Sequence, residues 1–136
     1  MQLNSAKDLE VYKKAYALAM NVFEVTRRFP SEEKYSLTDQ LRRSARSVCA
    51  NLREAWAKRR YKAHFLSELT DADAENSETD TWLDFAHDSG YLSRVEHEKL
   101  AIECRQVGAM LGKMINTPDP FLVKPTSDLR PLISDL

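Results

Sequence analysis

The sequence predicts an all-α protein, an antiparallel up-down-up-down four-helix bundle with a proline-containing C-terminal tail. Prolines are absent between Pro30 and Pro118, and only three glycines occur in the chain. Apolar residues in this stretch recur at steps of three and four residues, which is the helical period. Four such segments joined by short links favour an antiparallel bundle. We therefore expect one domain over residues 1–117 and an extended or partly disordered tail over 118–136.

The first helix is expected to begin after Asp8, because aspartate is a favourable N-cap residue. It should end near Phe29, because the residue before a proline disfavours helical geometry. Its apolar face is predicted to consist of Leu9, Tyr12, Tyr16, Ala19, Phe23 and Thr26.

The second helix, from about Ser36 to about Arg60, carries three faces where an ordinary bundle helix needs only one. The apolar stripe consists of Leu37, Leu41, Ala45, Val48, Leu52 and Ala55. A polar stripe beside it consists of Gln40, Arg43, Ser47, Asn51, Glu54 and Lys58. The arginine row on the far side consists of Arg42, Arg46, Arg53 and Arg60, with Cys49 and Trp56 along its edge. The two extra faces indicate surfaces that meet another molecule.

The third and fourth helices each show one continuous apolar stripe, and a short turn near Tyr61 is expected before the third. The third helix contributes Phe65, Leu69, Ala72, Thr79, Leu83 and Ala86, and the fourth contributes Leu100, Cys104, Val107, Leu111 and Met114. Asn76 interrupts the first of these stripes and should need a hydrogen-bond partner. Gly90 is a natural residue for the end of the third helix. Ser93 and Glu96 form a capping-box pattern at the start of the fourth.

The tail is more apolar than a typical disordered segment, although its prolines exclude a continuous helix. It contains Phe121, Leu122, Val123, Leu129, Leu132, Ile133 and Leu136. Two conformations are equally compatible with this composition: an extended segment docked on a neighbouring subunit, and a tail without contacts.

The charge balance restricts the function classes. The formal net charge is −1, whereas a protein that coats nucleic acid through bulk charge is normally strongly basic. Locally, a basic segment over 37–62 precedes a segment over 63–88 that has no lysine or arginine. No signal peptide and no stretch of membrane-spanning length occur. Cys49 and Cys104 match no metal spacing, so we expect two reduced thiols in a cytoplasmic protein.

The arginine row has two competing interpretations besides a plain solvated face. Arg46, Arg53 and Arg60 are seven residues apart, or about 10 Å on a straight helix, and such a row can follow a phosphate backbone. Trp56 could then stack on an unpaired base of RNA or DNA. Alternatively, the row pairs with an acidic strip on the third helix, within one subunit or between subunits. That strip consists of Glu68, Asp71, Glu75 and Glu78.

The polar stripe is interpreted as a subunit interface formed by Gln40, Arg43, Ser47, Asn51 and Glu54, because buried polar networks can fix register. The alternative is a boundary face that touches water. We expect no enzyme, cofactor or metal site. Asp84 and His87 imitate half of a di-metal bundle motif, but the sequence holds no second copy.

Several segments together resemble the four-helix bundle proteins encoded in intervening sequences of 23S rRNA genes, which are similar to accessory proteins of diversity-generating retroelements. The matching segments are 8–12 (DLEVY), 29–30 (FP), 35–45 (YSLTDQLRRSA), 90–92 (GYL) and the residues Ser47, Asn51 and Glu54. The resemblance covers about residues 7–116. It implies a bundle that assembles into a ring, with a pentamer as the best expectation, and a nucleic-acid role.

Two functional hypotheses follow. The first is a non-catalytic homo-oligomeric accessory protein that binds structured RNA through Arg42, Arg46, Arg53, Arg60 and Trp56. The second is a structural or protein-interaction ring without a nucleic-acid partner. The near-zero net charge and the acidic third helix favour the second, whereas the arginine row and the resemblance favour the first.

Overall fold

The computed structural model describes residues 3–124, and over that range the prediction of an all-α four-helix protein is confirmed. The helices are α1 (Glu10–Thr26), α2 (Leu37–Ala57), α3 (Lys62–Asp88) and α4 (Arg94–Asn116). Short 3-10 turns, η1 (Ala6–Asp8), η2 (Ser31–Glu33) and η3 (Asp119–Phe121), lie before α1, before α2 and after α4.

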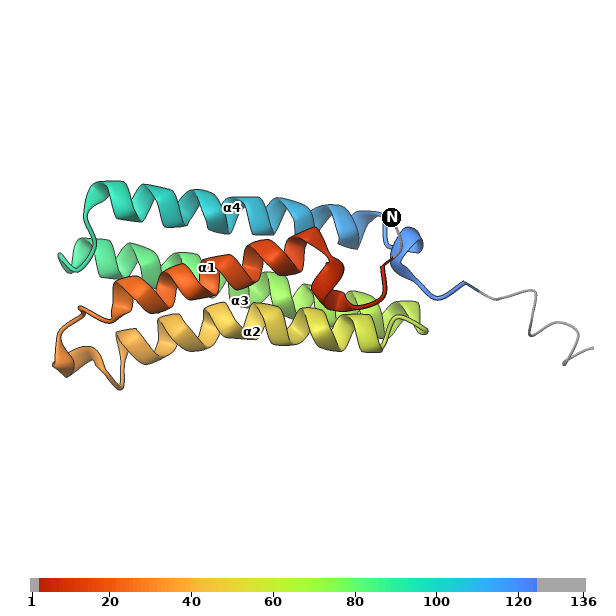
Figure 1. The fold of residues 1–136 in the computed structure, drawn as a ribbon, viewed down its shortest axis with the longest axis horizontal. Helices are drawn as coiled ribbons and strands as arrows, with labels where there is room; N and C mark the ends of the chain where they lie inside the picture. Colours follow the sequence, from red (N-terminus) through yellow and green to blue (C-terminus); the bar gives the residue numbers. More distant parts are fainter. Residues whose placement is uncertain (1–2, 125–136) are drawn as a thin grey trace, which may run out of the picture.

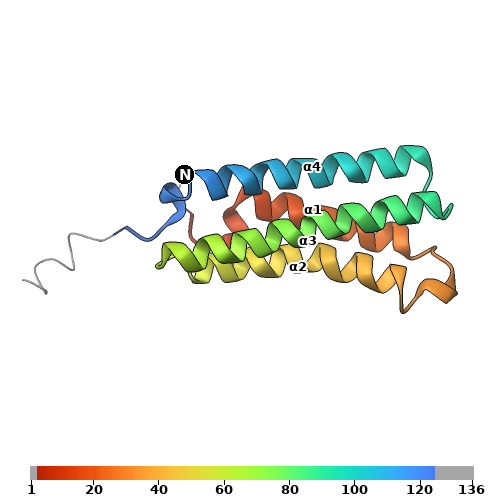
Figure 2. The same cartoon turned by 180° about the vertical axis from the view of Figure 1, so that it is seen from behind.

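The four helices form one elongated bundle in which successive helices run in opposite directions (Figures 1 and 2). Each helix packs against the next one along the chain, and α1 also packs against α4. The two helices α2 and α4 therefore lie on diagonally opposite corners, and the outer face of α2 points away from α4.

The apolar stripes predicted for α2, α3 and α4 form the core. Every residue of the α3 and α4 stripes is buried, as is the α2 stripe apart from the half-buried Leu37. Asn76 is also buried, and its amide nitrogen donates to the Cys104 carbonyl oxygen at 2.9 Å. The expected hydrogen-bond partner of this asparagine is thus a backbone group of α4.

The face of α1 that meets the core differs from the predicted one. The buried residues are Val11, Ala15, Leu18, Val22 and Thr26. Of the predicted stripe, Tyr16 is 54% exposed, while Tyr12 and Phe23 are only half-buried. Both stripes repeat at steps of three and four, so periodicity cannot separate them. The narrow aliphatic stripe fits between α2 and α4, and the wider aromatic rings remain along the rim of the bundle.

The helix ends agree with the predictions at α3 and α4 but not at the start of α1, and α1 and α2 end at Thr26 and Ala57, three residues before the predicted Phe29 and Arg60. Gly90 adopts a φ of +83° after α3, and Ser93 and Glu96 form a complete capping box at α4. Asp8 does not cap α1, because its carboxylate accepts from the Asn4 and Ser5 amides and closes the preceding η1 turn. Leu9 occupies the N-cap of α1 without a side-chain hydrogen bond.

The first residues of the predicted tail, 118–124, lie against the end of the bundle. Phe121 stacks near Phe65 of α3 with ring centroids 6.5 Å apart. The Val123 amide donates to the Arg59 carbonyl oxygen at 3.3 Å, so this segment crosses to the link between α2 and α3. The remaining part of the predicted tail, 125–136, lies outside the described residues.

Candidate nucleic-acid interface

The arginine row divides into two parts in the structure. Arg46, Arg53 and Arg60 are exposed, and none of them forms an ion pair within residues 3–124. Because α2 ends at Ala57, Arg60 lies in the following turn, and the helical spacing of about 10 Å applies only between Arg46 and Arg53. These exposed guanidinium groups can accept an external anion without first breaking an ion pair.

Arg42, the first member of the row, is instead half-buried between α2 and α1. Its Nε donates to Thr26 Oγ1 at 2.8 Å, and its guanidinium carbon lies 4.8 Å from the centroid of the Phe23 ring. This combination of a hydrogen bond and a cation–π contact holds the two helices together. The Arg42 side chain therefore connects α2 to α1, and its positive charge is held in a fixed position.

Trp56 does not present an open ring face for stacking. The guanidinium carbon of Arg59 lies 3.9 Å from its ring centroid, and Arg59 also donates to the Trp56 carbonyl oxygen at 2.7 Å. The side chain itself is half-buried against the core. The residue predicted to stack on a base thus already has a planar cation against it.

The acidic strip of α3 pairs with the polar stripe of α2. Arg43 lies 3.6 Å from Glu75 and 3.3 Å from Glu78, and Lys58 lies 2.7 Å from Glu68. The hydrogen bond from Lys58 lowers the pKa of the Glu68 carboxyl, and the same bond raises the pKa of Lys58. Within the subunit, α3 therefore neutralises the polar stripe, while Arg46 and Arg53 lie on another face.

The other members of the polar stripe border this seam. Gln40, Ser47 and Asn51 are half-buried, and their side chains form no hydrogen bond within residues 3–124. Glu54 is exposed and lies close enough to Glu68 to influence its pKa. Half-buried polar groups with unused hydrogen-bonding capacity are compatible with a subunit contact, and the interface assignment stays a prediction.

A basic groove lies along the N-terminal half of α2 and has a volume of about 490 Å³. It is lined by Lys34, Tyr35, Thr38, Asp39, Arg42, Arg43, Arg46, Ser47 and Ala50. Its lining contains four cationic side chains and one carboxylate, and of the four cations Arg43 is paired with glutamates of α3. The groove therefore contains two residues of the arginine row, Arg42 and Arg46, and two residues of the polar stripe, Arg43 and Ser47.

Two groove residues, Lys34 and Tyr35, were not among the predicted site residues. Both precede α2, and Tyr35 is 85% exposed. Helical periodicity cannot find them because they lie in a link. A signal was nevertheless present, since Tyr35 opens the longest segment that carries the family resemblance.

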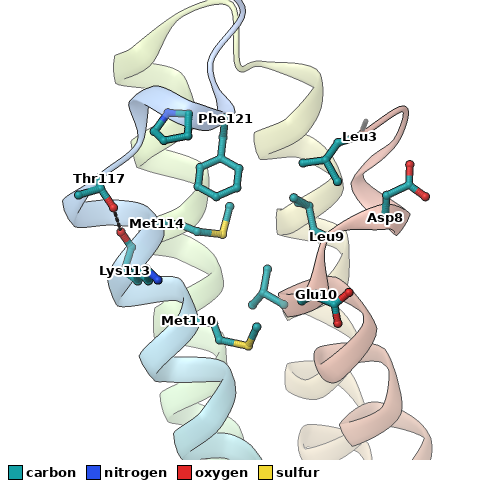
Figure 3. Close-up of a pocket in the computed structure, with 11 residues that line it drawn as sticks. Leu3, Asp8, Leu9, Glu10, Met110, Lys113, Met114, Thr117 and Phe121 are labelled. Carbon is teal, nitrogen blue, oxygen red and sulfur yellow. Dashed lines mark hydrogen bonds between the residues drawn. The ribbon is translucent and has the colours of Figure 1, made fainter. Parts of the chain in front are cut away.

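A second hollow, of about 450 Å³, lies at the opposite end of the bundle and has a different chemistry. Figure 3 shows Met110 and Met114 of α4 facing Leu9 near the start of α1, with Phe121 above them. Lys113, Asp8 and Glu10 lie among its lining residues. This hollow is predominantly apolar and does not concentrate positive charge.

Asp84 and His87, the residues that resemble half of a di-metal motif, both contact His97. His97 Nε2 lies 2.8 Å from an Asp84 carboxylate oxygen, and the His87 and His97 rings stack with centroids 4.5 Å apart. Within the described range 3–124, no three histidine, cysteine, aspartate or glutamate side chains are arranged to hold a metal ion. Among the helices of the same range, none has both the length and the apolar character that crossing a membrane requires.

By its fold and its groove, the protein is a small four-helix bundle with a basic groove along its second helix. The sequence model of the 23S rRNA-intervening sequence protein family matches residues 7–113, and the chain belongs to this family. The chain is similar to a crystal structure from Bacteroides thetaiotaomicron, which is described as a protein with unknown function from the S23 ribosomal protein family. It is 27% identical, has a TM-score of 0.73, and the match covers 79% of this chain and 96% of that one. No match was found among curated proteins.

Proposed function

We propose that this protein is a non-catalytic, homo-oligomeric bundle that binds structured RNA as an accessory protein. The binding surface consists of the basic groove together with Arg53 and Arg60 farther along the arginine row. The observation that carries the proposal is the placement of Arg46 and Arg53 on an exposed face without acidic partners among residues 3–124. A phosphate backbone supplies such partners at regular intervals.

The family to which the chain belongs supports a nucleic-acid role only through its gene context, because its name refers to intervening sequences of 23S rRNA. The physical argument is independent of that name. Arginine forms bidentate contacts with phosphate, and a concave basic surface focuses the attraction of an anionic ligand. The small net charge then restricts binding to one face rather than the whole surface.

Assembly into a ring of five copies is part of the same proposal and follows from the family resemblance. It is supported by the exposed face of α1, where Tyr16 and Met20 line a hollow of about 260 Å³ to which α2 contributes Arg46 and Cys49. Tyr16 is 54% and Met20 46% exposed, which is unusual for large apolar side chains that lie close together. Light scattering should give five times the chain mass of 15.6 kDa, and a monomer at micromolar concentration would contradict the ring.

RNA binding is tested by fluorescence anisotropy with a labelled structured RNA over a salt series. The logarithm of the association constant should fall linearly with the logarithm of salt concentration, by about 0.7 to 0.9 per phosphate contact. The double variant Arg46→Glu with Arg53→Glu should abolish binding at physiological salt and leave the mass of the assembly unchanged.

A matched control makes the same change in charge on α4, diagonally opposite the proposed surface. Arg94→Glu with Arg105→Glu replaces two exposed arginines there and should retain the affinity within a few-fold. Equal losses in both double variants would show that overall charge, and not this face, controls binding. Complete absence of binding at low salt would contradict the proposed function and favour a ring that contacts only proteins.

A further inference from the structure

We propose that the basic groove is a site for one unpaired nucleotide, whose base stacks on Tyr35 while its phosphate is held by Arg46. This inference rests on the proposed RNA-binding function and specifies which feature of the RNA the groove selects. It also replaces Trp56 as the stacking residue, because Arg59 already lies 3.9 Å from that ring centroid.

The Tyr35 ring is the aromatic surface that the groove offers. Its side chain is 85% exposed, although it lies next to a concave surface of about 490 Å³ that it helps to line. Lys34 Nζ lies over the ring at 5.3 Å from the centroid, and Tyr35 remains 85% exposed in spite of this cation–π contact, whereas Trp56 is half-buried. An aromatic ring beside a cationic groove is the usual arrangement for binding unpaired bases.

The segment that presents Tyr35 is held in place by Glu33. The Ser36 hydroxyl donates to one Glu33 carboxylate oxygen, and the Tyr91 hydroxyl donates to the other at 2.9 Å. The hydrogen bond from Ser36, followed by that from Tyr91, lowers the pKa of Glu33, so the carboxylate stays charged near neutral pH. Because this clamp ties the segment to the α3–α4 link, the backbone that carries Tyr35 is held in place before RNA arrives, which reduces the ordering that stacking requires.

The polar lining of the groove fits the other parts of a nucleotide. Arg46 has no ion pair within residues 3–124, so its guanidinium group can contact a phosphate, whereas Arg43 is already paired with Glu75 and Glu78. The polar residues Thr38 and Ser47 line the same surface. Asp39 supplies the one carboxylate there, which can accept a hydrogen bond from a ribose hydroxyl or an exocyclic amine.

A stacking site of this kind discriminates between paired and unpaired nucleotides. A base inside a duplex has neighbouring bases on both faces, so it has no face left for Tyr35. A bulged or looped-out base exposes both faces and can stack on the ring. The arginines contact phosphates in either case, so only the contribution of Tyr35 should depend on the presence of an unpaired base.

The experiment uses the full chain and two labelled RNA hairpins with the same stem, one of which carries a single bulged 2-aminopurine. In fluorescence anisotropy at one salt concentration, the wild-type protein should bind the bulged hairpin about 5- to 100-fold more tightly, as expected for one stacked base. Tyr35→Ala should lose this preference while retaining its affinity for the paired hairpin, and Tyr35→Trp should keep the preference. Binding should also quench the 2-aminopurine emission with the wild-type protein and with Tyr35→Trp, but not with Tyr35→Ala.

Tyr61→Ala is the matched control, because Tyr61 is 63% exposed and lies in the link at the other end of α2. It should behave as the wild type does with both hairpins. Equal affinity of the wild-type protein for the two hairpins, or a preference that survives in Tyr35→Ala, would overturn the nucleotide site and leave RNA binding intact. Failure of the wild-type protein to bind either hairpin would instead overturn the proposed function.

Discussion

The Thr79 hydroxyl of α3 donates a hydrogen bond to Ser44 Oγ of α2 at 2.9 Å, and neither side chain is exposed to solvent. The same Thr79 hydroxyl also lies 2.9 Å from the Glu75 carbonyl oxygen, and Ser44 donates to the Leu41 carbonyl oxygen at 3.3 Å. The pair is therefore a small satisfied polar contact inside an otherwise apolar seam. It fixes the register of α3 against the helix that carries the basic groove.

Replacing both members of this contact should cost less stability than the sum of the two single replacements. Thr79→Val removes the donor and should lower the free energy of unfolding by about 0.5 to 1.5 kcal/mol, the usual net value of one hydrogen bond. The double variant Thr79→Val with Ser44→Ala leaves no hydroxyl at the seam, so its cost should be less than the sum of the two single costs. Urea unfolding of the four proteins in a double-mutant cycle measures the coupling, and simple additivity would contradict it.

Two glycines of α4 should respond in opposite ways to alanine. A Cβ at Gly112 would meet nothing within 4 Å, so Gly112→Ala should stabilise the protein by up to about 1 kcal/mol through helix propensity. A Cβ at Gly108 would lie 3.3 Å from the Asn76 amide nitrogen, which is buried and bonded to Cys104. In Gly108→Ala the crowding of Asn76 should therefore outweigh the gain in helix propensity, so this variant should be less stable than the wild type.

Thermal unfolding of both glycine variants at the same protein concentration provides the comparison. A stabilised Gly108→Ala would show that Asn76 can move without losing its hydrogen bond. The double variant Gly108→Ala with Asn76→Ala would then separate crowding from the loss of that bond.

The capping box of α4 should make stability depend on pH in the acidic range. The hydrogen bond from the Ser93 amide, assisted by Arg28, lowers the pKa of Glu96 from its ordinary value of 4.5. A lowered pKa in the folded state means that the stabilisation is complete above pH 4.5 and is lost as the pH falls through the folded-state value. Glu96→Gln should therefore be less stable than the wild type at pH 7, and the difference should shrink below about pH 4.5.

Urea unfolding of the wild type and Glu96→Gln at several pH values between 7 and 3.5 follows this difference directly. A gap in unfolding free energy that stays constant over the whole range would argue against an ionised Glu96 as the stabilising form.

The two cysteines should be unreactive until the protein unfolds. Burial raises the pKa of Cys49 to about 11 and that of Cys104 to about 12. At pH 8 the thiolate of Cys49 then amounts to about one part in a thousand, compared with about a quarter for a free thiol. Reaction with a thiol-specific chromogenic reagent should be at least a hundred-fold slower than in denaturant, and Cys49→Ser should remove the faster of the two phases.

Much of the fold follows from local pattern because helical geometry projects residues three and four apart onto one face. In α3 and α4 a single apolar stripe was available, and the structure buries that stripe completely. The hydrogen bond of Asn76 also follows from local pattern, because a polar side chain inside an apolar stripe needs a partner. The caps at Gly90 and Ser93 are equally local, because each depends on a few consecutive residues.

The candidate site was predictable only in part. The alignment of Arg46 and Arg53 was predicted from their spacing, whereas the absence of ion pairs to α3 depends on helix packing. The half-buried position of Arg42 likewise depends on Thr26 and Phe23 of another helix. The cation over Trp56 comes from Arg59 in a turn whose conformation no periodicity describes. Tyr35 was missed for the same reason, since its exposure depends on a link and on the clamp that Glu33 forms with Tyr91.

The amino-acid pattern alone thus determined the number of helices, most of their boundaries, the core faces of α2, α3 and α4, and the alignment of Arg46 and Arg53 on one face of α2. Tertiary structure decided which of two equivalent stripes of α1 is buried, which cations α3 neutralises, and where the arginines form a groove. The physical reason is that helix periodicity is a property of neighbouring residues. The choice among equivalent faces depends on how much space the packed partner helices leave for each side chain.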